Sequence, residues 1–250
     1  MPRRLYLEQF GPVHALPVLH YRMEFAQLVR MAVTQVRPDA IAIELPATLE
    51  TPFLRALHRL PQISVISYQE GSESVYLLVE PADPLVEAAR RALELNIPLH
   101  FIDADINSYP RHRQQLPDSY CVTRIGLEAY YREYLHACRS ETADYNDRRR
   151  EQGMAWRLQQ LALLHQRILF VGGMAHIERV KQLFATPRQR RWSGSTAAGS
   201  ASPTCTPIPA VKFWPNSPFF RRSTNCGAAR SPKKYRRAEP ACADAFMHLS

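Results

Sequence analysis

The sequence predicts an α/β protein: a mainly parallel sheet with helices on both faces, followed by a disordered basic tail. Up to about Phe184, short apolar runs alternate with amphipathic stretches, a pattern typical of βαβ units. From Thr186 onward this periodicity stops, and the chain becomes rich in Pro, Ser, Thr and Ala. Such a composition buries too little apolar surface to offset the entropy of ordering. We therefore expect an α/β domain over residues 1–185 and a low-complexity tail over residues 186–250, where a truncation or a shifted reading frame would produce the same abrupt change.

Each element of the domain is predicted from its own pattern. The strands are short runs of β-branched, aromatic and other apolar residues between turn residues. They cover residues 3–10, 39–45, 63–69, 75–80, 98–105 and 167–173. The helices are longer stretches with apolar residues three or four positions apart. They cover residues 21–36, 51–60, 83–95, 124–139, 144–165 and the stretch from His176.

Turn and capping residues set the boundaries of these elements. Arg37-Pro38 breaks the chain after the first helix. Thr51 before Pro52 and Asp83 before Pro84 each suit the N-cap and first turn of a helix. At the end of the last strand, Gly172 and Gly173 allow a tight turn before His176.

Charge and cysteine content narrow the function classes. The excess behind the net charge of +9 lies in the tail, where eleven Lys and Arg face two Asp and Glu. Residues 1–185 have no net charge and show no matching basic stripe, so nucleic-acid binding is disfavoured. If the tail did bind nucleic acid, the affinity would depend strongly on salt. No apolar run is long enough to predict a membrane span, and the start does not resemble a secretory signal. Five scattered cysteines without a C-x-x-C pair argue against a disulfide framework or zinc knuckle, and a cytoplasmic location is expected.

Polar residues gather where the predicted strands end. "GPVH" (11–14) follows the first strand, Glu44 ends the second, Asp103 and Asp105 end a later one, and "GMAH" (173–176) follows the last. In an open parallel sheet, ligands bind beyond the carboxyl ends of the strands. The two Gly-x-x-His segments are therefore expected to bring His14 and His176 together with Glu44. Gly11 and Gly173 would let a substrate approach the backbone closely.

Two imidazoles and a carboxylate suit two kinds of chemistry. They form a familiar ligand set for a divalent metal with open positions, and they also suit metal-free general-base catalysis. The basic start of the helix over 144–165, at Arg148, Arg149 and Arg150, is unfavourable for the helix dipole. This placement suggests an acidic partner, either a carboxylate of the site or an anionic group of the substrate.

Five segments, in order along residues 5–180, together resemble one superfamily. They are "GPVH" (11–14), "VRPDAIAIEL" (36–45), "FIDADI" (101–106), "REQGMA" (150–155) and "ILFVGGMAHI" (168–177). The pattern is similar to that of TraB/PrgY pheromone-shutdown proteins, GumN proteins and TIKI proteases, with erythromycin esterases as more distant relatives. The chain departs from it in having Glu151 where Asp or Asn is usual, and in lacking the membrane segments common in TraB/PrgY proteins.

The resemblance implies that His14, Glu44, Arg150 and His176 fall on active-site positions, with Asp103 and Asp105 nearby. TIKI proteins are regarded as metal-dependent proteases, and the esterase relatives use a histidine base. We therefore expect a hydrolase of amide or ester bonds that acts on a peptide or small molecule.

In this hypothesis, His14, Glu44 and His176 bind a divalent metal (Mn, Co or Zn) or polarise the attacking water directly. Arg150 would stabilise the oxyanion or anchor a substrate carboxylate, and Asp103 and Asp105 would support the histidines from behind. The alternative is a regulatory protein that binds a peptide or ligand without turnover.

Overall fold

The computed structural model describes residues 4–70, 73–106, 118–138, 143–186, 204–207 and 219–223. Its main sheet has five strands in the order β1-β2-β7-β3-β6. β1 pairs antiparallel with β2, and the other three pairings are parallel. The strands are β1 (Glu8–Phe10), β2 (Val13–Val18), β7 (Ile168–Gly173), β3 (Ala40–Pro46) and β6 (Leu99–Asp103). The predicted fold class, a mainly parallel α/β sheet, is confirmed.

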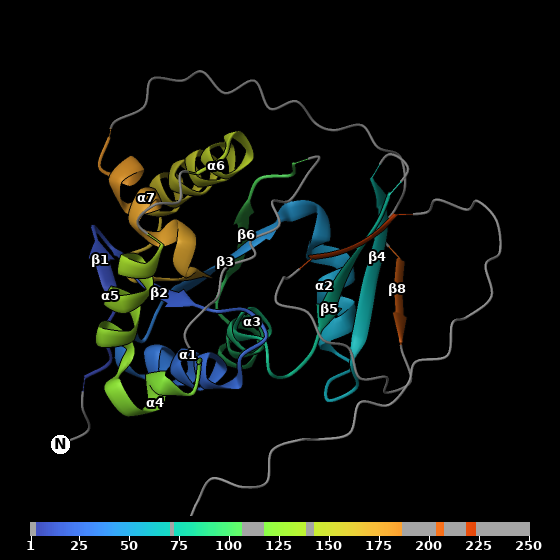
Figure 1. Ribbon diagram of the computed structural model, residues 1–250, viewed down its shortest axis with the longest axis horizontal. Coiled ribbons are helices and arrows are strands. Elements are labelled where there is room, and N and C mark those ends of the chain that lie inside the picture. The colour runs from blue at the N-terminus through green and yellow to red at the C-terminus, as the bar shows by residue number, and fades with distance from the viewer. Residues whose placement is uncertain are drawn as a thin grey trace, which may run out of the picture.

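Helices cover both faces of this sheet (Figure 1). On one face, α1 (Met23–Val36) packs against α3 (Pro84–Leu95), and on the other α6 (Tyr145–Leu161) packs against α7 (Met174–Phe184). The shorter helical elements are η1 (Ala47–Leu49), α2 (Glu50–Leu57), α4 (Cys121–Ile125) and α5 (Leu127–Ala137). The single helix predicted over 124–139 is interrupted at Gly126, whose φ of 84° does not belong to a helix.

The core lies between the central strands and the two helical layers. β3 and β7 are buried along their whole length, as their near-continuous apolar runs predict for parallel strands covered on both faces. Ile41, Ile43 and Phe170 are among the largest fully buried side chains. This packing fixes where each strand ends relative to its neighbours in the sheet. It therefore also fixes the positions of the polar residues at the strand ends.

Two predicted helix starts have different outcomes. Asp83 caps α3 as expected, because its side chain accepts the backbone N–H groups of Leu85 and Val86. Thr51 is not a cap: α2 begins one residue earlier, at Glu50, and Leu49 occupies the N-cap position without a side-chain hydrogen bond.

A second, antiparallel sheet lies beside the main one (Figure 1). Its hairpin consists of β4 (Ser64–Glu70) and β5 (Glu73–Val79), which were predicted as strands. Two short segments of the tail, β8 (Thr204–Pro207) and β9 (Phe219–Ser223), pair with the outer sides of this hairpin. Apart from Thr186 and these two strands, the tail lies outside the described residues.

The first strand region differs from the prediction in a way that matters for the site. "GPVH" does not form a turn at the carboxyl edge. Gly11, with φ 55°, and Pro12 instead form the hairpin turn between β1 and β2, and His14 is the second residue of β2. The apolar run that continues from Val13 is the actual parallel strand. β1 pairs only with residues 13–15 of β2, so Pro17 has no neighbouring strand on that side. Proline, which has no N–H to donate, is tolerated at such an edge position.

Candidate active site

A buried arginine lies at the centre of a polar cluster at the carboxyl edge of the sheet. Nη2 of Arg150 donates to Oε1 of Glu44 at 2.5 Å and to Oδ2 of Asp103 at 2.7 Å. Its Nε donates to both Asp103 oxygens, and its Nη1 lies 3.2 Å from Nε2 of His176. These four residues are at most 5% exposed. Glu44 and Asp103 are thus the acidic partners that the sequence predicted for the basic start of α6.

Glu44 comes from the end of β3 and is held in its ionised form. Its Oε2 accepts the backbone N–H of Gly173, while Oε1 faces Arg150 and His176. Burial alone would raise the pKa of Glu44, but His176, Arg150 and His20 together lower it to about 2. The site therefore contains one permanently charged carboxylate at neutral pH.

Asp103 ends β6 and shares the same guanidinium. Its Oδ1 also accepts the backbone N–H of Ala104 at 2.8 Å. Burial raises the pKa of Asp103, and the neighbouring Glu44 carboxylate raises it further, against the lowering effect of Arg150. The environment thus moves the pKa values of Glu44 and Asp103 in opposite directions, as in sites where two carboxyl groups have different proton roles.

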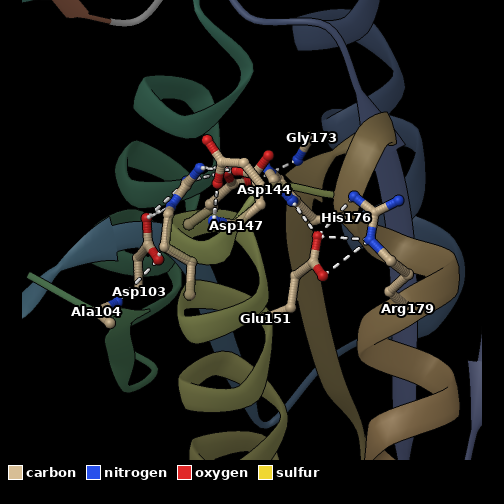
Figure 2. A network of polar contacts seen from close by, with 10 residues as sticks. Asp103, Ala104, Asp144, Asp147, Glu151, Gly173, His176 and Arg179 are labelled. Carbon is tan, nitrogen blue, oxygen red and sulfur yellow. Dashed lines mark hydrogen bonds and ion pairs between the residues drawn. The ribbon is translucent and has the colours of Figure 1, made fainter. Parts of the chain in front are cut away.

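His176 is fixed from both sides of its ring (Figure 2). Nδ1 lies 2.8 Å from Oε1 of Glu151, and the same carboxylate accepts hydrogen bonds from Arg179. Burial would lower the pKa of His176, but the charges of Glu44 and Glu151 outweigh it and raise the pKa. When His176 is protonated, its Nε2–H can donate to Glu44 at 3.4 Å, and when it is neutral, Nε2 accepts from Arg150.

A second histidine reaches this cluster, and it is His20, which the sequence analysis missed. A Cβ on Gly173 would lie 3.4 Å from Nε2 of His20 and 3.2 Å from Oε2 of Glu44, so both groups border the same glycine. On its other side, Nδ1 of His20 is buried without a hydrogen bond and lies 3.8 Å from Oδ2 of Asp83. The next residue, Tyr21, has the left-handed φ of 57° and donates its N–H to Asp83. A backbone conformation that non-glycine residues rarely adopt thus orients this turn.

His14 lies at the opposite edge of the sheet, and the prediction that it meets His176 and Glu44 is wrong. It pairs with Leu169 near the beginning of β7, whereas Gly173 ends that strand. Burial and the charges of Arg4 and Arg167, at the same amino edge, lower the pKa of His14. Gly11 sits in the hairpin turn and faces Phe184, so it does not border the cluster either.

Asp105 also remains outside the cluster. It is exposed and accepts a hydrogen bond from Thr48 at 2.6 Å.

The sequence signal that identifies His20 is its place directly after the run "VHALPVL" (13–19), as the first strongly polar residue beyond a buried strand. The more conspicuous Gly-x-x-His repeat drew attention to His14 instead.

The residues of the cluster do not fit a divalent metal as they are arranged. The expected ligand His14 is absent from the site, and the acceptor atoms of Glu44, Asp103 and His176 all face the guanidinium of Arg150. Within the described ranges, no group of three or more His, Cys, Asp or Glu side chains is arranged to hold a metal ion. The positive charge of this site is supplied by arginine.

The fold and the cluster define an α/β protein with a His, Glu, Asp and Arg site at the carboxyl edge of a parallel sheet. In comparisons by sequence and by structure, no family model, curated protein or solved structure matches the chain. Among the described residues, no helix is long and apolar enough to cross a membrane.

Proposed function

We propose that the protein is a cytoplasmic hydrolase of amide or ester bonds in a peptide or small molecule, with His20 as its general base. The observation that carries this proposal is the position of the His20 ring, which has the carboxylate of Asp83 on one side and Glu44 and Gly173 on the other. The cytoplasmic location rests on the scattered cysteines of the sequence.

The carboxylate of Asp83 orients His20 for this role. Asp83 is itself fixed, because one oxygen caps α3 and the other accepts the N–H of Tyr21. Its distance of 3.8 Å from Nδ1 of His20 is too long for a hydrogen bond. Catalytic contacts of this kind often tighten only when substrate binds. Nε2 of His20 is then the atom that takes a proton from the attacking water, and it returns this proton to the leaving amine or alcohol when the C–N or C–O bond breaks.

The opposite side of the site supplies the positive charge. Protonated His176 donates from Nε2 to the oxygen that becomes negative during attack on the carbonyl, in place of its 3.4 Å contact with Glu44. Arg150 has a different role from the one first expected. Its donors are engaged by Glu44 and Asp103, so it holds these carboxylates rather than the substrate.

The test is turnover on a panel of chromogenic esters and fluorogenic peptides, with His20→Ala beside its matched control His14→Ala. Both variants remove one histidine associated with β2, but only His20 borders the cluster. We expect His20→Ala to lower kcat by about 10²-fold or more and His14→Ala to keep the wild-type rate. Full turnover in His20→Ala would refute the role of this residue.

A second candidate, ligand capture without turnover, is favoured by one observation. Glu44, Asp103, Arg150 and His176 are buried and mutually hydrogen-bonded, as expected of a rigid binding site. Capture depletes a ligand only up to one equivalent per chain and forms no product. Product in excess of the enzyme concentration therefore separates hydrolysis from capture.

A further inference from the structure

We infer that the tail strands β8 and β9 cover the two edges of the β4–β5 hairpin, and that an uncovered edge pairs with the same edge of a second copy of this chain. The pairing of the four strands carries this inference, and it does not rest on the proposed hydrolysis.

The hairpin by itself has two strand edges. β4 and β5 pair with each other along their whole length, from Ser64 opposite Val79 to Glu70 opposite Glu73. A strand edge presents a row of unpaired N–H and C=O groups, which is a template for pairing with another chain. Here β8 pairs with the outer side of β4, and β9 pairs with the outer side of β5 (Figure 1). The tail thus makes the hairpin the centre of a four-stranded sheet.

The composition of the four strands agrees with these inner and outer positions. Edge strands of natural sheets are often short and carry proline or charged residues, which hinder further pairing. β8 has four residues and ends with Pro207, and β9 has five residues and contains Arg221 and Arg222. The covered parts of β4 and β5, "SVIS" (64–67) and "ESVYL" (73–77), contain no Pro, Lys or Arg. β4 and β5 therefore have the composition of inner strands.

The hairpin is also attached to the rest of the domain without the tail. Ile66, Leu77 and Val79 belong to the hydrophobic core, and α2 packs against both strands of the hairpin. Loss of the tail strands would therefore leave the hairpin in place with its edges open.

A second copy of the chain is the partner that fits such an edge. Pairing at an edge uses backbone groups, and every copy presents the same edge. Two identical strands pair antiparallel about a twofold axis, so β4 would meet β4, or β5 would meet β5. One open edge in each chain gives a closed dimer, whereas two open edges allow association to continue from copy to copy.

Pairs of proline substitutions in the full chain open one edge at a time. Successive residues of a strand direct their N–H groups to opposite sides, so two adjacent prolines remove an N–H that faces the hairpin. Cys205→Pro with Thr206→Pro opens the β4 edge, and Phe220→Pro with Arg221→Pro opens the β5 edge.

The matched control is Ala197→Pro with Ala198→Pro, which lies in the tail but outside both strands. Analytical ultracentrifugation at a series of micromolar concentrations measures the mass of each protein. We expect the wild type and the control to have the mass of one chain. Each single-edge variant should approach the mass of two chains and go no further, and the variant with all four prolines should form larger species. A single-edge variant that stays monomeric, or that aggregates without stopping at a dimer, would overturn the inference.

Amide hydrogen exchange is a second measurement, and it includes the wild type. Residues 64–67 and 73–77 should exchange slowly in the wild type. In each single-edge variant, exchange at the opened edge should be faster when the protein is dilute and slow again when it dimerises. Equal exchange in the wild type and the dilute variants would show that the tail does not cover the hairpin. A wild-type dimer that the prolines dissociate would also overturn the inference, because the tail strands would then pair between chains.

Discussion

Nε2 of His176 lies 3.4 Å from Oε1 of Glu44, across the boundary between the neighbouring strands β7 and β3. Both groups are buried, and each raises the population of the charged form of the other. The protonation state of His176 is therefore set by its two carboxylate neighbours, Glu44 and Glu151, rather than by water.

The titration of His176 is expected to depend on Glu151. Burial lowers the pKa of His176. The negative charges of Glu44 and Glu151, together with the hydrogen bond to Glu151, outweigh burial and raise this pKa above 6.5. Glu151→Gln removes one of these charges, so the pKa of His176 should fall in that variant. Imidazole resonances followed by NMR across pH 5 to 9 measure the change, and an unchanged pKa would contradict the assigned contact.

Stability in acid is expected to depend on Glu44. Its pKa is lowered from 4.5 in the unfolded chain to about 2 in the folded protein. Glu44 therefore contributes fully to the free energy of unfolding above pH 4.5, and this contribution is lost as the pH falls toward 2. A shift of this size corresponds to roughly 3 kcal/mol of unfolding free energy. Urea unfolding between pH 2 and 6 should show a shallower pH dependence in Glu44→Gln than in the wild type. Parallel curves would show that Glu44 is not the group responsible.

Two adjacent glycines are expected to differ in what their replacement disturbs. A Cβ on Gly172 would lie 2.6 Å from the ring of the buried Phe170, so Gly172→Ala should cost about 1–3 kcal/mol of stability. A Cβ on Gly173 would instead lie 3.2 Å from Glu44 and 3.4 Å from His20. Because small displacements of reacting groups are costly, Gly173→Ala should reduce turnover on the order of 10²-fold with a smaller loss of stability.

Thermal unfolding and kcat, measured on both glycine variants, separate the two effects. If Gly172→Ala lost more activity than Gly173→Ala at equal folded fraction, Gly173 would not be the glycine that borders the reacting groups.

Asp83 joins a helix cap to His20, and its two roles can be separated. Serine caps a helix nearly as well as aspartate but carries no charge to orient the imidazole. Asp83→Ser should therefore keep a Tm close to that of the wild type while kcat falls and KM changes little. A fall in Tm with unchanged kcat would show that Asp83 serves only the helix.

The fold could be predicted because its signals are local. The buried strands β3 and β7 are continuous apolar runs, and the capping residue Asp83 stands directly before Pro84. Glu44, Asp103 and His176 could be placed at one edge for the same reason. Glu44 and Asp103 lie at the end of such runs, and His176 follows one by three residues.

His14 and His20 show where this approach fails. Whether Gly11-Pro12 ends a strand at the site or turns a hairpin away from it depends on the pairing of β1 with β2, which is a tertiary property. Six residues of a strand span about 20 Å, so the choice between these histidines moves the imidazole from one edge of the sheet to the other. Arg150 was expected at the site with an acidic partner, but its position between Glu44 and Asp103 was not predicted, because these partners are distant in the sequence and meet only in the folded sheet.

The same distance between partners gives the polar cluster a role in the accuracy of folding. Side chains alternate between the two faces of a strand, so a slip of one residue between β3 and β7 would turn Glu44 away from Arg150. Such a slip would break the buried ion pair between Glu44 and Arg150 and leave the carboxylate of Glu44 without this partner, at a cost of several kcal/mol. An apolar strand alone tolerates misalignment with little penalty. The charges at the carboxyl edge therefore select a single register for the centre of the sheet.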